Sequence, residues 1–83
     1  MLGKRVYGCK HLLSPGEYMK NEDGSWWFCT PNNIHGQLAQ LNPPWQIMEH
    51  PDDTITVHPS ILCRGAEGYQ WHGYLIRGEW KEC

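Results

Sequence analysis

The residues of this chain that could do chemistry are mainly its cysteines and histidines. Cys29 is followed by His35 in a Cys-x5-His spacing, and Cys63 and His72 form a second pair further along. A structural zinc ion takes four thiolate or imidazole ligands in a tetrahedron, and small domains use such ions to stabilise their fold. These two pairs predict a Cys₂His₂ zinc site, although the chain has none of the closely spaced Cys or His pairs typical of such sites. The alternative is that the thiols are buried as small apolar side chains and that His72 only completes a hydrogen bond.

A second kind of chemistry would use Ser60 and His72. A serine hydroxyl becomes a nucleophile when an adjacent histidine removes its proton and a carboxylate orients that histidine. Asp52 or Asp53 could supply the carboxylate. Ser60 directly follows a proline, where serines are also common as turn residues, so a small hydrolase is one hypothesis among several.

The size and charge of the chain limit which class of protein it can belong to. With 83 residues, of which 40% are hydrophobic and 12% aromatic, residues 1–83 are expected to form a single folded domain. The formal net charge is −2, and residues 21–63 hold five acidic side chains with no Lys or Arg. Because phosphate contacts supply much of the affinity of nucleic-acid binders, this acidic centre argues against nucleic acid as a partner.

The cysteines and the N-terminal residues indicate in which cellular compartment the protein is expected. The N-terminus MLGKRVYGC has no apolar run typical of a secretion signal, and no window is long and apolar enough to predict a membrane span. We therefore expect a cytoplasmic protein, in the host cell if the gene belongs to a phage, with its four cysteines reduced.

Turn and strand patterns predict a mainly β fold: a small antiparallel sheet, a sandwich or a partly open barrel, with at most one short helix. The runs GEYMK and SWWFC flank the turn sequence NEDG, and YQWHGYLI and EWKEC flank Arg77-Gly78. WQIME, DTITVH and PSILC are further strand candidates. Residues 33–41 are the best helical candidate, but a strand over GQLAQL fits equally well.

The last hairpin has two predicted registers. A two-residue loop at Arg77-Gly78 would place His72 opposite Cys83, with Trp71 and Trp80 on the other face. A turn with a bulge at Gly78 would shift the pairing by one residue and place His72 opposite Glu82. Since a slip of one residue reverses every side chain, the register decides the neighbours of His72.

Tryptophan is abundant for so short a chain, with five residues. Neighbours in a strand point to opposite faces, so one of Trp26 and Trp27 can lie in the core while the other meets solvent or a partner. Exposed tryptophans often anchor protein interfaces. We therefore take Trp26, Trp27 and Trp45 as candidate binding residues. A homo-oligomer is also open, because small sheets have edges to cover.

The order of the motifs resembles a family of short, uncharacterised proteins of tailed phages, prophages and bacterial genomes. The motifs are WWFCTPNNIHGQL, WQI, TITVHPSILCRG and WHGYLIRGEW, and the resemblance covers roughly residues 25–80. The residues that match are Cys29, Pro31, Pro59, Ser60, Ile61, His72 and Gly78. Thr30 separates Cys29 from Pro31, where many relatives have the two adjacent. Trp71 stands where relatives often have a cysteine, which weakens the case for a shared zinc site.

The resemblance implies a compact, β-rich accessory protein of phage origin, and it implies no established reaction. The leading hypothesis is therefore a non-enzymatic protein that binds another protein, such as a host or defence factor. The alternatives are a structural zinc-binding module and a small hydrolase that uses Ser60 and His72.

Overall fold

The computed structural model describes residues 1–8, 12–38 and 46–83 and consists of two four-stranded sheets. The first sheet has the order β1-β2-β3-β4. Its strands are β1 (Lys4–Arg5), β2 (Glu17–Lys20), β3 (Trp26–Cys29) and β4 (His35–Leu38). The pairs β2–β3 and β3–β4 are antiparallel, whereas β1 runs parallel to β2. The part of residues 33–41 that the structure describes therefore contains a strand, as the alternative interpretation of that segment predicted.

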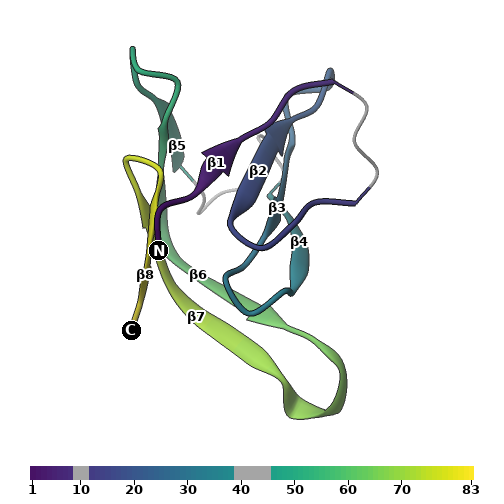
Figure 1. Ribbon diagram of the computed structural model, residues 1–83. Coiled ribbons are helices and arrows are strands. Elements are labelled where there is room, and N and C mark those ends of the chain that lie inside the picture. Colours follow the sequence, from purple (N-terminus) through teal and green to yellow (C-terminus); the bar gives the residue numbers. More distant parts are fainter. Residues whose placement is uncertain (9–11, 39–45) are drawn as a thin grey trace.

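The second sheet is entirely antiparallel and has the order β5-β6-β7-β8. Its strands are β5 (Gln46–Glu49), β6 (Ile55–Arg64), β7 (Gln70–Ile76) and β8 (Glu79–Glu82). A short 3₁₀ turn over Ala66–Gly68 joins β6 to β7. The two strands predicted at DTITVH and PSILC are parts of one long strand, β6. Figure 1 shows the β6–β7 hairpin extending beneath the first sheet.

Three of the hairpins are closed by the same kind of loop. In the first loop, the N–H of Asn21 donates to the carbonyl of Ser25, and the carbonyl of Asn21 accepts from the N–H three residues further on. Thr30 and His50 begin the other two loops with the same pair of hydrogen bonds. The residues that donate back to the start of each loop, Gly24, Asn33 and Asp53, all have a positive φ. Glycine, asparagine and aspartate tolerate this left-handed conformation better than other residues. The sequences NEDG, TPNN and HPDD therefore fix the turns between β2 and β3, β3 and β4, and β5 and β6.

The last hairpin adopts the register with a two-residue loop. Ile76 pairs with Glu79 and Leu75 with Trp80 across the loop. Arg77 and Gly78 both have positive φ, of 46° and 76°, as a type I′ turn requires. The N–H of Cys83 donates to the carbonyl of His72 at 3.0 Å, so these two residues lie opposite each other. His72 is exposed, and its neighbour Trp71 is buried on the other face.

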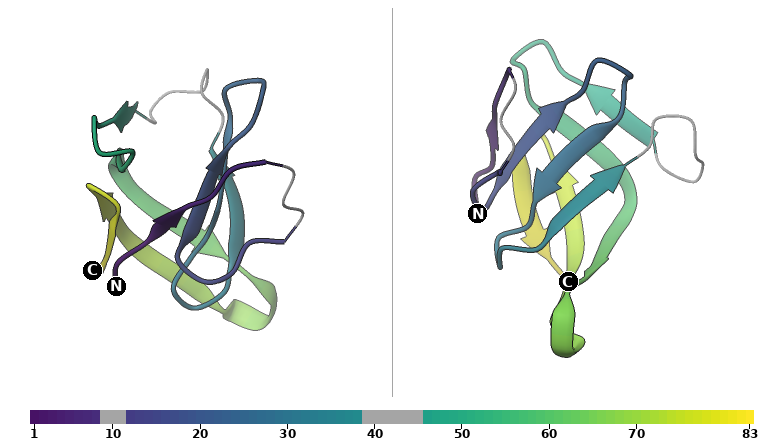
Figure 2. Two further views of the ribbon diagram at one scale, coloured as in Figure 1. Left: turned by 45° about the horizontal axis from the view of Figure 1, so that its top comes forward. Right: turned by 90° about the vertical axis from the view of Figure 1, so that its right-hand side faces the viewer.

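The two sheets pack around one apolar core, so the predicted mainly β fold is confirmed in its two-sheet form. The right-hand view of Figure 2 looks onto the first sheet, with the second sheet behind it. The buried residues of this core come from both sheets: Tyr18, Trp26, Phe28, Ile34, Ile55, Val57, Ile61, Trp71, Leu75 and Trp80. Trp80 also donates its indole N–H to the carbonyl of Gly16 at 2.9 Å, which ties the sheets together. The described residues include no helix long and apolar enough to cross a membrane.

The middle of β6 departs from regular pairing. Val57 pairs with Leu75 and Ile61 pairs with Gly73, so β6 advances from position 57 to 61 while β7 advances only from 75 to 73. Such a bulge adds residues to one strand and redirects its side chains. Proline within a strand is found at bulges or edges because it has no N–H to donate to the ladder. Pro59 lies inside this irregular segment, directly before Ser60.

Candidate functional site

Ser60 and His72 are in hydrogen-bond contact. Nε2 of His72 lies 3.0 Å from Oγ of Ser60, and the two residues come from the neighbouring strands β6 and β7. In the tautomer that holds its proton on Nδ1, Nε2 of the imidazole accepts a hydrogen bond from the serine hydroxyl. This is the contact that a serine nucleophile and its general base require.

Both side chains reach solvent. On β7 the burial alternates strictly, so Trp71, Gly73 and Leu75 face the core while His72 and Tyr74 face outward. Ser60 is partly exposed, next to the fully buried Ile61. The pair therefore lies on the outer face of the second sheet, where a substrate could reach it.

Gly73 leaves room for the ring of Trp71 beside the site. A Cβ on Gly73 would lie 2.6 Å from Cη2 of Trp71 and would also overlap the carbonyl of Lys81. Trp71 in turn packs edge-on against Trp80, with ring centroids 5.3 Å apart. The backbone that holds His72 is thus fixed from beneath by two packed indoles. This role of Gly73 was not evident in the sequence.

The carboxylates expected to orient His72 lie elsewhere. Asp52 and Asp53 belong to the β5–β6 loop, where Oδ1 of Asp52 accepts two bonds from Thr54. These bonds hold the pKa of Asp52 below its usual value, through the Thr54 hydroxyl first and its N–H second. His72 pairs with Leu62, and at ~3.3 Å per residue Leu62 is on the order of 25 Å along the chain direction of β6 from Thr54. Within the described residues, no carboxylate contacts His72, so the site is a serine–histidine pair.

The first predicted zinc pair, Cys29 and His35, lies on the first sheet. The two residues are register partners across β3 and β4. The buried thiol of Cys29 lies 3.3 Å from Oδ1 of Asn33, and Nε2 of His35 lies 2.9 Å from the carbonyl oxygen of Leu13. Burial raises the pKa of the Cys29 thiol, with the charge of Glu17 a smaller cause.

The second predicted zinc pair is divided between the two faces of the second sheet. Cys63 is partly buried against the core, and burial raises the pKa of its thiol to about 11. His72 points outward to Ser60. Among the residues that the structure describes, no group of three or more His, Cys, Asp or Glu side chains could hold a metal ion. The structure thus brings Cys29 together with His35, and it does not bring Cys63 together with His72.

The predicted binding tryptophans take different positions. Trp26 is buried in the core beneath the guanidinium of Arg5, which lies 4.9 Å from the ring centroid. Trp27 is 37% exposed. Trp45 falls outside the described residues.

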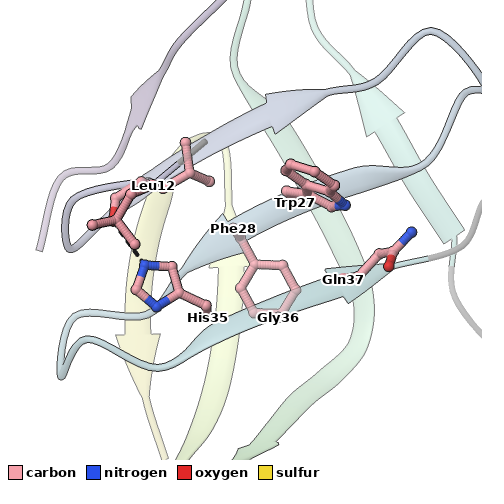
Figure 3. A pocket seen from close by; sticks show the side chains of 7 residues that line it. Leu12, Trp27, Phe28, His35, Gly36 and Gln37 are labelled. Atoms are coloured by element: carbon pink, nitrogen blue, oxygen red, sulfur yellow. Dashed lines mark hydrogen bonds between the residues drawn. The ribbon is translucent and has the colours of Figure 1, made fainter. Parts of the chain in front are cut away.

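Trp27 lines an open cavity of about 510 Å³ on the outer face of the first sheet. Figure 3 shows its indole at one end of this cavity and His35 at the other, beside Leu12. The cavity does not include Ser60 or His72. A nucleophile requires a base within hydrogen-bond reach, and among the described residues the lining of this cavity provides no such serine–histidine contact.

Comparison with protein families gives a match over residues 6–83, nearly the whole chain. The matching family is described as the bacterial ubiquitination-like system serine protease, BubE. The comparisons with curated proteins and with solved structures gave no match. The phage or prophage origin expected from the motifs stays a prediction. Because the family model matches residues 6–83, the chain belongs to the BubE family.

Proposed function

We propose that this protein is a serine protease in which Ser60 is the nucleophile and His72 is the general base. The observation that supports this most directly is the 3.0 Å contact between Oγ of Ser60 and Nε2 of His72. The family description as a serine protease of a bacterial ubiquitination-like system is a second, independent support. The substrate would be a protein of such a system, cleaved at a peptide bond.

The proposed reaction follows the serine hydrolase scheme. Oγ of Ser60 attacks the carbonyl carbon of the scissile bond while its proton passes to Nε2 of His72. The imidazolium then gives that proton to the departing amine, and the C–N bond breaks to leave an acyl ester on Ser60. A water molecule attacks the ester, His72 accepts a proton from the water and returns it to Oγ, and the acid product leaves.

A fluorophosphonate probe tests this assignment, because it forms a covalent bond only with an activated serine. Intact mass spectrometry should find one adduct on the wild-type protein and none on Ser60→Ala. Ser14→Ala is a matched control, because Ser14 is an exposed serine on the segment before β2, and it should be labelled like the wild type. Labelling of Ser60→Ala at the wild-type rate would refute the proposal.

Protein binding is the second candidate function, and the exposed indole of Trp27 favours it. Trp27 projects from β3 beside an open, largely apolar cavity. Tryptophan at a pocket edge is a frequent anchor of protein interfaces. This function is compatible with the first, since a protease must also hold its protein substrate, and Trp27 lies on a different sheet from Ser60.

A further inference from the structure

We propose that the outer face of β6 and β7 beside Ser60 is a subsite for an apolar side chain of an extended peptide substrate. This inference rests on the proposed function, because it assigns the substrate class of the same site. Its two central residues are Leu62 and Tyr74. We call the surface that they form the apolar subsite.

The register brings both residues next to the reactive pair. Leu62 is the residue directly opposite His72 in the β6–β7 ladder. It lies two positions beyond Ser60 along β6, and Tyr74 lies two positions beyond His72 along β7. Side chains two positions apart in a strand share a face. Ser60, His72, Leu62 and Tyr74 therefore share the outer face of the sheet.

The exposure of these two side chains sets them apart from the core. Leu62 is 47% exposed and Tyr74 is 39% exposed, whereas their neighbours Ile61 and Leu75 are each 1% exposed. A single exposed apolar side chain needs no explanation, but apolar groups clustered at a reactive centre mark a ligand surface. Contact with a substrate side chain would remove both from water.

The charges on this face argue for an apolar substrate side chain in preference to a basic one. The exposed or partly exposed residues on this face are His58, Ser60, Leu62 and Arg64 of β6 and Gln70, His72, Tyr74 and Ile76 of β7. This set contains no carboxylate that could pair with a substrate lysine or arginine. Lys81, opposite Tyr74 on β8, is itself 3.4 Å from Oε1 of Glu79. An apolar side chain is therefore the one that Leu62 and Tyr74 can bind.

Peptidyl phosphonates carrying different side chains test this inference directly. The probes are diphenyl phosphonates with a leucine, lysine or aspartate side chain next to the reactive phosphorus, together with small diisopropyl fluorophosphate. The rate constant for modification of Ser60 would be measured for each probe by intact mass spectrometry. We expect the leucine probe to react about ten-fold faster than the two charged probes, as an apolar pocket discriminates by this order.

Leu62→Ser should slow the leucine probe about ten-fold and leave diisopropyl fluorophosphate unchanged. Met48→Ser is the matched control, because Met48 is 50% exposed but lies on β5 opposite Thr56, away from Leu62, and it should leave every rate unchanged. Tyr74→Ser gives a second test should Leu62→Ser unfold. Circular dichroism would establish that each variant is folded.

The outcomes separate this inference from the proposed function. If diisopropyl fluorophosphate modifies Ser60 but the leucine probe is unaffected by Leu62→Ser and Tyr74→Ser, the apolar subsite is wrong and the protease assignment stands. If no probe modifies Ser60, both fail. If Leu62→Ser converts a dimer to a monomer in light scattering while every rate stays the same, the face binds a second copy of the chain, and the subsite inference is overturned.

Discussion

His72 contacts Ser60 although the residue directly opposite His72 in the β6–β7 ladder is Leu62. The contact is therefore diagonal across the two strands, since Ser60 lies two positions before Leu62 on β6 and shares its face of the sheet. A bulge is a common device for redirecting a side chain next to a reactive site. Ser60 is the last residue of the irregular segment before the regular ladder resumes at Ile61, and Pro59 precedes it.

His72→Gln should lower kcat about a thousand-fold and change KM little. Glutamine can still hydrogen-bond the hydroxyl of Ser60, but it cannot take up the proton, and general base catalysis contributes about 10² to 10⁴ in rate. Steady-state kinetics on a cleaved peptide would measure both constants. His58→Gln is the control, because His58 is exposed on the same strand close to Ser60. A larger loss in His58→Gln than in His72→Gln would assign the base to His58.

Gly73→Ala should destabilise the protein by about 1–3 kcal/mol, because the added methyl group has no space beside Trp71 and the carbonyl of Lys81. Chemical denaturation followed by tryptophan fluorescence would measure the change. Gly68→Ala serves as a comparison, since a Cβ at Gly68 meets nothing within 4 Å, although its φ of 74° adds backbone strain. Equal stability of Gly73→Ala and the wild type would contradict the packing described beneath His72.

Cys63 should resist alkylation at neutral pH, whereas Cys83 should react readily. Only the thiolate reacts, and burial raises the pKa of Cys63 to about 11, so almost no thiolate exists at pH 7 to 8. Cys83 is exposed. Peptide mass spectrometry after treatment with iodoacetamide would compare the two sites, and denatured protein gives the fully reactive reference. Equal rates in the folded protein would show that Cys63 opens to solvent.

The Glu49 carboxylate should make stability fall at acid pH. A hydrogen bond from Lys20 and an ion pair with Arg5 join Glu49 of β5 to the first sheet, and they lower its pKa from the ordinary 4.5. Because the pKa is lowered in the folded state, this stabilisation is present above pH 4.5 and is lost as the pH falls through the lowered value.

Glu49→Gln should therefore flatten the pH dependence of the free energy of unfolding. The loss at pH 7 should not exceed about 1 kcal/mol, since the carboxylate is partly exposed to screening water. Urea denaturation between about pH 3 and pH 7, which covers the range in which carboxylates titrate, measures the effect. Glu22→Gln is the control at an exposed loop position. An unchanged pH profile in Glu49→Gln would contradict this role.

Trp27→Ala should weaken the binding of a protein substrate by about ten-fold or more, as is usual for an anchoring tryptophan. The rate of modification by a small fluorophosphonate should stay the same, because Trp27 and Ser60 lie on different sheets. Comparing KM for a protein substrate with KM for a short peptide of the same cleavage sequence would separate the two effects. An unchanged KM for both substrates would remove Trp27 as an anchor.

Much of the fold was predictable because it is specified locally. The turn sequences NEDG and Arg77-Gly78 lie at hairpins, and the alternation of Trp71, His72 and Tyr74 predicts which side chains are buried. Local sequence did not predict the parallel pairing of β1 with β2. The two strands are not joined by a tight turn, so no local turn sequence marks the contact of Lys4 with Glu17. It also left the terminal register open, because Gly78 suits either turn.

The sequence by itself determined the residue types: a serine after a proline, a histidine in an alternating strand, and cysteines at apolar positions. Only the tertiary structure decided which of them meet. Strand pairing brings Ser60 to His72 and directs Cys63 to the core on the opposite face of the sheet. The physical reason is that side chains in a strand alternate between the two faces of the sheet. Which side chains meet therefore depends on the strand register and on the bulge in β6. Both are set by backbone pairing across the whole sheet.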